Sequence, residues 1–215
     1  MESKEAGSVA IPHGGAVVEA RGGAATEELK IILLGDSAVG KSKLLERYLM
    51  DDYSPQQDST YALTLFRQTA TVQDRRSGLP KQVQITYWDT AGQERFQKMH
   101  PSYYFRAHGC VLAFDVTRKA TYQHLQQWLD ELREYAESIP VLCVANKIDV
   151  DIKVTSKAFA FPQKHNLPFR FCSAADGTNV VDVFQTAIQM AYDYKTGGKQ
   201  DFLSEVMDVL DHGAA

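Results

Sequence analysis

The fold is decided by residues 35–42, which read Gly35-Asp36-Ser37-Ala38-Val39-Gly40-Lys41-Ser42. This run fits the phosphate-loop pattern of a glycine, four residues, a glycine, a lysine and a serine or threonine. The apolar run at residues 29–34 predicts a short strand before it, and leucines at helical spacing in residues 43–49 predict a short helix after it. In such a unit, backbone N–H groups at the helix N-terminus bind phosphate oxygens. The run therefore predicts a phosphate-binding site at residues 35–43.

Three side chains of this run have a predicted effect of their own. Lys41 is expected to reach the β- and γ-phosphates of a nucleotide, and the Ser42 hydroxyl is expected to bind Mg²⁺. Ala38 carries a Cβ inside a tight loop, where it restricts the backbone and crowds the phosphates. We therefore expect looser nucleotide binding and faster exchange than a glycine at this position would give.

A second motif, residues 88–94, ends the strand predicted at residues 82–88 and reads Trp88-Asp89-Thr90-Ala91-Gly92-Gln93-Glu94. Asp89 at a strand end is suited to hold Mg²⁺ through a water molecule, and the Gly92 N–H is suited to sense a γ-phosphate. Gln93 is the candidate for orienting the attacking water. The alternative is that Gln93 is a solvated loop residue.

A third motif, Asn146-Lys147-Ile148-Asp149, follows an apolar strand-like run and predicts recognition of a purine base. Guanine presents two donors, N1–H and the exocyclic N2–H₂, and one fixed carboxylate, that of Asp149, can accept from both. Asn146 is expected to reach N7 and to tie this loop to the phosphate loop, while Lys147 lies along the ring. The pair Ser173-Ala174, after the next strand, is expected to offer a backbone N–H to the guanine O6.

The remaining pattern alternates strands with helices and predicts an α/β fold. The expected fold is a phosphate-loop NTPase G domain with a six-stranded, mostly parallel sheet, one antiparallel edge strand from a hairpin, and helices on both faces. The expected further strands are residues 62–72, 110–115, 141–145 and 169–172, and the expected further helices are residues 122–135, 155–165, 180–192 and 201–211.

Composition limits the classes of function. The chain has 215 residues and a formal net charge of −4, which argues against non-specific nucleic-acid binding. Its three cysteines lie in apolar strand-like runs and are expected to be buried thiols of a protein in a reducing compartment. No apolar run approaches the roughly 18 residues of a membrane span, so a cytoplasmic protein is expected.

We expect a disordered leader at residues 1–26, a domain at residues 27–195, and a linker with a short amphipathic helix at residues 196–215.

Together these motifs resemble the small GTPase superfamily over residues 29–195, and the Rab branch in particular, given residues 88–96 and Ser102-Tyr103-Tyr104. The resemblance implies a first switch at residues 53–66, in which Tyr53 lies near the base and Thr60 binds the metal and the γ-phosphate. It implies a second switch at residues 92–107. Where ordinary Rabs carry Ile-Gly-Val-Asp-Phe after this threonine, the chain reads Tyr-Ala-Leu-Thr-Leu-Phe. It also lacks the usual lysine, at Ala175.

Ala38, residues 59–65, residues 99–104 and residues 173–181 are similar to the Rab-like protein 2 family. That resemblance implies a ciliary-base (basal body) and ciliary localisation, a centriolar protein that recruits the GTP form, and engagement of the intraflagellar transport B complex. The chain ends Asp211-His212-Gly213-Ala214-Ala215, without a cysteine to prenylate, so no lipid anchor is expected.

We therefore expect a monomeric GTP/GDP switch with slow intrinsic hydrolysis, GTP-dependent effectors and an activating protein. Two alternatives remain: a nucleotide-gated binding module with negligible hydrolysis, and a general Rab-type vesicle-trafficking regulator. An ATP-using kinase is disfavoured by Asp149.

The predicted catalytic residues are Gln93, Lys41 and Thr60, and the predicted metal ligands are Ser42, Thr60 and Asp89. The predicted nucleotide-binding residues are Gly35, Asp36, Ser37, Ala38, Val39, Gly40, Lys41, Ser42, Lys43, Tyr53, Thr60, Gly92, Asn146, Lys147, Asp149, Ser173, Ala174 and Ala175.

Overall fold

The computed structural model describes residues 27–50, 63–90 and 101–212, and for residues 198–212 it describes the backbone alone. One six-stranded sheet forms its centre, in the order β2-β3-β1-β4-β5-β6. The strands are β1 (Glu27–Leu34), β2 (Leu63–Gln73), β3 (Pro80–Thr90), β4 (Gly109–Asp115), β5 (Val141–Asn146) and β6 (Phe169–Phe171). All neighbouring pairs are parallel except β2 with β3, which is antiparallel. The predicted α/β sheet with one antiparallel edge strand is therefore confirmed.

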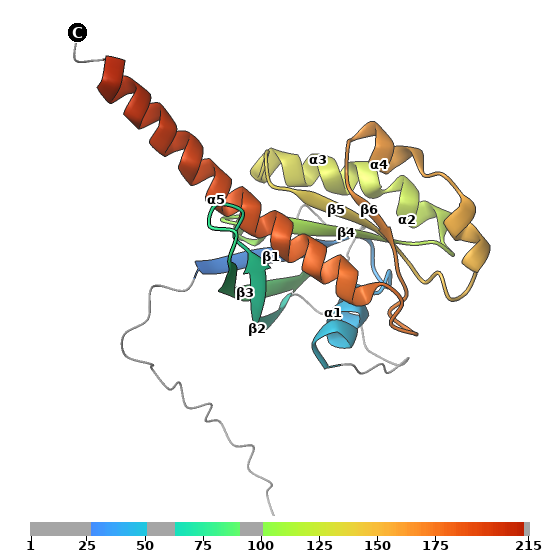
Figure 1. The fold of residues 1–215 in the computed structure, drawn as a ribbon. Coiled ribbons are helices and arrows are strands. Elements are labelled where there is room, and N and C mark those ends of the chain that lie inside the picture. Colours follow the sequence, from blue (N-terminus) through green and yellow to red (C-terminus); the bar gives the residue numbers. More distant parts are fainter. Residues whose placement is uncertain (1–26, 51–62, 91–100, 213–215) are drawn as a thin grey trace, which may run out of the picture.

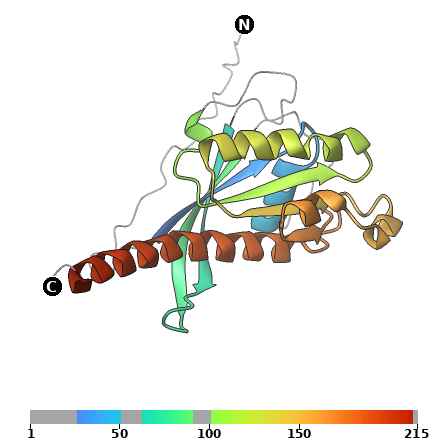
Figure 2. The same cartoon turned by 90° about the horizontal axis from the view of Figure 1, so that it is seen from above.

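Helices cover both faces of this sheet (Figure 1, Figure 2). The helices α1 (Lys41–Met50) and α5 (Val180–His212) pack on one face. On the other face lie α2 (Lys119–Gln123), α3 (Leu125–Tyr135) and α4 (Ala160–Lys164). Two short 3₁₀ helices, η1 (Pro101–Tyr103) and η2 (Ile152–Ser156), lie in connections. Within the part of the chain that the structure describes, no helix has both the length and the hydropathy needed to span a bilayer.

Strand β1 shows why the sheet is covered twice. Successive residues of a strand point to opposite faces. Leu29, Ile31 and Leu33 are fully buried in the core under α1 and α5. Ile32 and Leu34 are fully buried in the second core, under α3. An apolar strand of this kind is stable only in the middle of a sheet with helices on both sides.

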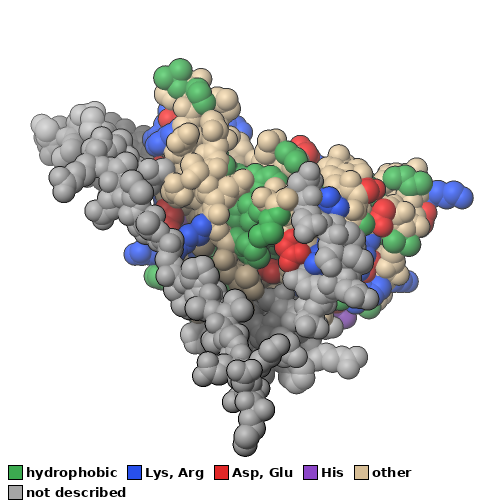
Figure 3. All heavy atoms as spheres, turned by 90° about the horizontal axis from the view of Figure 1, so that it is seen from below, with side chains coloured by type: hydrophobic (Ala, Val, Ile, Leu, Met, Phe, Trp, Pro, Cys, Tyr) green, Lys and Arg blue, Asp and Glu red, His purple; other side chains and the backbone are tan. Residues whose placement is uncertain are grey.

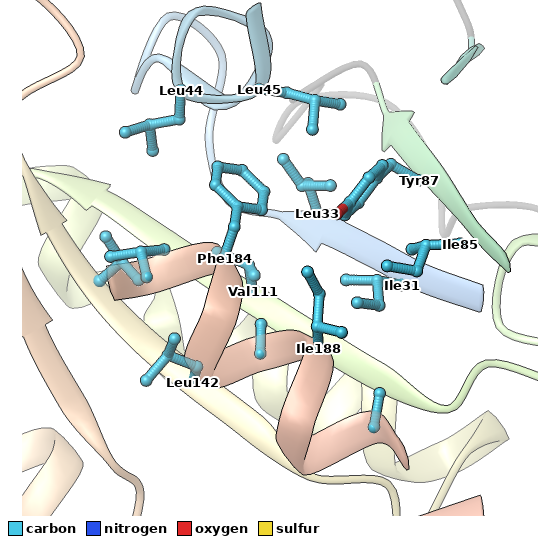
Figure 4. Close-up of a cluster of buried hydrophobic side chains, with 14 of the residues drawn as sticks. Ile31, Leu33, Leu44, Leu45, Ile85, Tyr87, Val111, Leu142, Phe184 and Ile188 are labelled. Carbon is cyan, nitrogen blue, oxygen red and sulfur yellow. The ribbon is translucent and has the colours of Figure 1, made fainter. Parts of the chain in front are cut away.

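The first core brings the helix after the phosphate loop against α5 (Figure 4). Leu44 and Leu45 of α1 and Phe184 and Ile188 of α5 all point toward the sheet in this view. The Tyr48 ring of α1 stacks on Phe184 with a centroid separation of 4.6 Å. Burial of side chains of this size contributes about 2 kcal/mol each, so α1 and the loop before it are held firmly on the sheet.

Three helical predictions were wrong in their boundaries. The helix expected at residues 122–135 is divided into α2, which ends at Gln123, and α3, which begins at Leu125. The helix expected at residues 155–165 begins instead at Ala160, and the segment before it forms η2. Pro162 explains this boundary, because proline is tolerated in the first turn of a helix but not in its interior. The break expected at residues 196–198 is absent, and α5 runs without interruption through Gly197 to His212. Glycine in a helix costs about 1 kcal/mol relative to alanine, which a long helix tolerates.

The face shown in Figure 3 carries mixed charge. Lys and Arg side chains are interspersed there with Asp and Glu side chains, around a group of hydrophobic side chains. Interspersed charges of both signs create little long-range attraction for a polyanion. The described side chains of this face therefore form no continuous patch of positive charge.

Candidate nucleotide-binding site

The parallel strands bring the predicted motifs to one edge of the sheet. Strands β1, β3, β4, β5 and β6 run in the same direction, so the loops at their carboxyl ends meet at the same edge. Open α/β sheets bind ligands at this edge. The phosphate loop follows β1, the Asp89 segment ends β3, and the Asn146 loop follows β5. Three sequence motifs that lie far apart along the chain therefore form one site.

Glycine is required at both ends of the phosphate loop. Gly35 has a φ of +133°, and a Cβ there would lie 2.1 Å from the Ala113 carbonyl oxygen. Gly40 has a φ of +100°, and a Cβ there would lie 2.4 Å from Asn146 Nδ2. Real Cβ atoms do not approach other atoms this closely, and these φ values disfavour any L side chain. The pattern's two glycines thus let the loop pack directly on β4 and on the Asn146 loop.

Side chains hold the carbonyl groups of the loop on its outer side. Lys41 Nζ donates to the first two carbonyls, those of Gly35 at 2.8 Å and Asp36 at 3.1 Å. Each of the next three carbonyls accepts from a different side chain. The pairs are Arg118 Nη2 to Ser37 O (2.7 Å), Lys147 Nζ to Ala38 O (2.8 Å) and Asn146 Nδ2 to Val39 O (2.8 Å). In a trans peptide the N–H points away from the C=O, so the N–H groups of residues 38–40 are turned to the opposite side, where a phosphate would bind.

Ala38 adopts a strained conformation. Its φ is +59°, in the left-handed region that favours glycine. For an L residue this conformation costs about 1 kcal/mol or more, because the Cβ approaches the following carbonyl oxygen. The expected effect of Ala38 on the loop backbone is therefore present in the structure.

Asp115, at the end of β4, anchors two of the cations behind the loop. Its carboxylate is buried, and Oδ2 lies 2.7 Å from Lys147 Nζ and 3.0 Å from Arg118 Nε. The Thr117 N–H and hydroxyl both donate to Oδ1. Burial alone would raise the pKa of Asp115, but the hydrogen bonds from Lys147 and Thr117 hold this pKa below its ordinary value. Asp115 is therefore a charged group that fixes Lys147 and Arg118 in place.

Sequence reasoning missed Asp115 and Arg118. The signal for Asp115 was its position, directly after a buried parallel strand at the edge where the motifs meet. Arg118 had no comparable signal, because its contact with Ser37 joins residues that are 81 positions apart.

The Asp36 and Lys43 side chains are turned away from the predicted phosphate position. Asp36 accepts from Trp128 Nε1 at 2.8 Å and lies 2.6 Å from His124 Nδ1, so its carboxylate faces α3. Lys43 Nζ pairs with Glu46 at 2.8 Å. At both predicted binding positions the backbone N–H is therefore the group suited to bind a nucleotide.

The predicted metal ligands meet beside the first turn of α1. Ser42 Oγ donates to Asp89 Oδ2 at 2.5 Å, and Asp89 is buried at the end of β3. Hydroxyl and carboxylate oxygens are the ligands that Mg²⁺ prefers. The two residues therefore fit a magnesium ion held between the phosphate loop and β3.

The base-reading loop is built around the buried Asn146 side chain. While Nδ2 holds Val39 O, Asn146 Oδ1 accepts from the Ala174 N–H at 3.1 Å. The predicted link between the base loop and the phosphate loop is thus present, and the Ala174 N–H expected at the guanine O6 also contacts Asn146. Arg47 of α1 donates to the carbonyls of Ala174 and Ala175, which fixes the loop from the other side.

Asp149 is exposed, and a hydrogen bond from Ser173 orients its carboxylate. Ser173 Oγ donates to Asp149 Oδ1 at 2.6 Å, which fixes the rotamer of a carboxylate that otherwise faces solvent. Lys147 has a φ of +71°, and its ammonium is held by Ala38 O and Asp115. The base loop therefore presents one accepting group, Asp149, for a ring with two adjacent donors.

Four predicted residues lie outside the described part of the chain. They are Tyr53, Thr60, Gly92 and Gln93. The roles predicted for them stay predictions.

A phosphate loop and an adjoining base-reading loop at the carboxyl edge of this sheet define the class of phosphate-loop G domains. Residues 30–193 match the Ras family. The chain therefore belongs to the Ras family of small GTPases, whose members in general bind GTP, GDP and Mg²⁺ and hydrolyse GTP.

Comparison with known proteins shows which small GTPases this chain is similar to. Rab-like protein 2A of Pongo abelii and Rab-like protein 2B of Homo sapiens are each 56% identical over 188 residues, which is 87% of this chain and 79% of the relative. The Ras-related protein RABA4b of Arabidopsis thaliana is 36% identical over 180 residues, 82% of this chain and 77% of the relative. The chain is thus a small GTPase of the Rab/Ras type that is similar to the Rab-like 2 proteins, as predicted.

The strain at Ala38 predicts that Ala38→Gly slows GDP release. Removing a cost of about 1 kcal/mol from the binding conformation corresponds to about fivefold slower release. The measurement is dissociation of a fluorescent GDP analogue in excess GDP. Ala38→Val is the opposing variant and is expected to accelerate release, because a β-branched residue tolerates this φ least. An unchanged rate in Ala38→Gly would contradict the prediction.

Proposed function

We propose that this small GTPase is a GTP/GDP switch that hydrolyses GTP slowly with Mg²⁺ and recruits partners in its GTP form. The observation that carries the proposal is the pair of hydrogen bonds made by Asn146. They join a phosphate-binding loop to the loop segment whose Ser173 orients the Asp149 carboxylate. Intrinsic turnover on the order of 10⁻⁴ s⁻¹ is expected without an activating protein.

The described residues supply positioning and charge for the reaction. The N–H groups of residues 38–40 and the helix N-terminus of α1 bind the phosphates. The Gly35 and Asp36 carbonyls orient the Lys41 ammonium, which is suited to bind phosphate oxygens. Ser42 and Asp89 would hold Mg²⁺, which when bound neutralises charge on the β- and γ-phosphates. By the family resemblance, Gln93 orients the attacking water and Thr60 and Gly92 sense the γ-phosphate.

A surface that includes the C-terminal part of the predicted second switch is suited to bind a partner. Lys30 Nζ donates to the carbonyls of Ser102 and Phe105 and lies 3.4 Å from the centroid of the Trp88 ring. Burial lowers the pKa of Lys30 to about 8. Phe105 is 66% exposed and Leu65, which pairs with Trp88 across the strands, is 49% exposed. Exposed aromatic and aliphatic side chains on an anchored segment are typical of partner-binding surfaces.

Guanine selection by Asp149 is tested with Asp149→Asn. An asparagine keeps one acceptor but replaces the other with a donor, which opposes the guanine N2–H₂ and suits the C2 carbonyl of xanthine. We expect GDP affinity to fall by about 10- to 100-fold and the affinity for xanthosine diphosphate to rise. Asp151→Asn is the matched control, because Asp151 lies in the same loop and caps η2. If Asp149→Asn binds GDP as tightly as the parent chain, the base-reading role is wrong.

The rate of GTP hydrolysis distinguishes the proposed switch from the alternative, a nucleotide-gated binding module with negligible hydrolysis. The strained Ala38 is the observation that favours the module, because faster exchange would load the protein with cellular GTP without turnover. Single-turnover hydrolysis of GTP by the parent chain and by Gln93→Leu distinguishes the two. A switch predicts a measurable parent rate that falls about tenfold or more in the variant, since leucine cannot orient water. Equal, near-zero rates would support the module.

We further propose that the switch is cytoplasmic and works at the ciliary base and in the cilium, with a centriolar protein and the intraflagellar transport B complex as partners. The support is the resemblance to the Rab-like 2 family, together with 56% identity to Rab-like protein 2A and 2B. A role as a general Rab-type trafficking regulator is the alternative, supported by 36% identity to RABA4b.

Affinity capture from ciliated cells tests this placement. The protein is loaded with a non-hydrolysable GTP analogue or with GDP, and the retained proteins are compared. The expected result is selective retention of intraflagellar transport B subunits by the GTP-analogue form. Retention of vesicle-trafficking effectors instead would favour the alternative.

A further inference from the structure

Arg118 lies behind the phosphate loop, in the segment between β4 and α2. Its guanidinium makes two hydrogen bonds in different directions: Nη2 donates to Ser37 O at 2.7 Å and Nε donates to Asp115 Oδ2 at 3.0 Å. Its side chain is 42% exposed, while that of Asp115 is 1% exposed. Arg118 thus bridges a buried anchor and the outer side of the loop.

We propose that Arg118 is a positioning residue for nucleotide retention, which holds the phosphate loop in its binding conformation by fixing the peptide before Ala38. The proposal rests on the proposed nucleotide binding, and it assigns Arg118 no contact with the nucleotide.

The argument starts from the two peptide planes that flank Ala38. The backbone dihedrals of a residue are the rotations of its two neighbouring peptide planes about its Cα. Arg118 holds the carbonyl of the first plane, Ser37–Ala38, and Lys147 holds the carbonyl of the second, Ala38–Val39. Both cations are bound by the same Asp115 carboxylate. The φ of +59° at Ala38 is therefore maintained from outside by one buried anion and two cations.

Loss of the Arg118 bond gives the strained residue a way to relax. Alanine prefers negative φ, so the Ser37–Ala38 peptide rotates more readily once Arg118 no longer holds its carbonyl. The same rotation turns the Ala38 N–H away from the phosphate side. A bound nucleotide would then lose a donor that the loop otherwise presents.

The geometry requires arginine rather than any cation. The planar guanidinium presents donors in fixed, diverging directions, and here Nε and Nη2 serve different partners. A lysine ammonium at the end of a flexible chain keeps the charge but does not reproduce this pair of bonds. Substitution by lysine therefore separates the effect of charge from that of the bridge.

The chain offers a closely matched control in Arg170. Arg170 Nε donates to Asp182 at 2.6 Å, Nη1 donates to the Phe169 carbonyl at 3.1 Å, and its side chain is 40% exposed. It therefore bonds the same two kinds of partner as Arg118, a carboxylate and a backbone carbonyl, and is exposed to a similar degree, away from the phosphate loop. The two arginines differ in the carboxylate, because Asp182 is 54% exposed and Asp115 is 1% exposed.

The experiment measures release and association rates of a fluorescent GDP analogue for the parent chain, Arg118→Gln, Arg118→Lys and Arg170→Gln. Loss of a hydrogen bond to a charged group predicts about tenfold faster release in both Arg118 variants. The association rate is expected to match that of Arg170→Gln, so that the loss of affinity comes from release alone. Release at the parent rate in Arg118→Gln overturns the proposal, and so does equal acceleration in Arg170→Gln.

A double variant with Ala38→Gly separates positioning from a general loss of stability. Glycine adopts positive φ without cost, so the loop no longer depends on Arg118. In the Ala38→Gly background, Arg118→Gln is expected to change release by less than about twofold. An undiminished effect in that background overturns the proposal. Failure of the parent chain to bind any guanine nucleotide would instead overturn the proposed function itself, and this inference with it.

Discussion

The buried side chain of Asn146 connects the two halves of the nucleotide site. It donates to Val39 O in the phosphate loop and accepts from the Ala174 N–H in the base loop, over 107 and 28 positions of sequence. A buried amide that lost either bond would keep the desolvation cost without the compensating hydrogen bond, about 1–3 kcal/mol. The phosphate-binding N–H groups and the Asp149 carboxylate keep their separation because this amide fixes it. The predicted recognition of phosphate and of base therefore depends on a single rigid unit rather than on two independent loops.

Around that unit, side chains of the protein itself hold the loop's conformation. Its carbonyls are fixed from behind by lysine, arginine and asparagine side chains, and Ala38 is held in a conformation that it would not adopt alone. Donors that are already oriented do not have to be ordered at the moment of binding or reaction, which is why preorganised sites bind charge strongly. Ala38 reduces the stability of this loop conformation, because part of the stabilisation from Asp115, Lys147 and Arg118 only offsets the strain of the positive φ at Ala38.

The sequence was sufficient for the fold, and the phosphate-loop and Asn146 motifs that it singled out lie together at one edge of the sheet. The glycine spacing of residues 35–42 and the alternation of apolar runs report local and periodic properties, and the structure confirms the sheet that they predicted. The boundaries that failed, at Pro162 and Gly197, depend on how one residue competes with the rest of its helix. Asp115 could have been found from its position at the end of a buried parallel strand. Arg118 and His124 could not, because their partners are determined by packing, and no local pattern encodes which distant carbonyl or carboxylate an arginine or histidine meets.

The close approach of Gly40 to Asn146 has a consequence for how this chain can diverge. Any side chain at residue 40 would enter the space of the Asn146 amide, and a smaller residue at 146 that relieved the clash would remove the link between the two loops. A single substitution at residue 40 or at residue 146 therefore disrupts the nucleotide site. The site is kept only if both residues change together in a compensating way. A change in base preference is therefore expected to arise by substitution of the exposed Asp149, which leaves the contact between Gly40 and Asn146 intact.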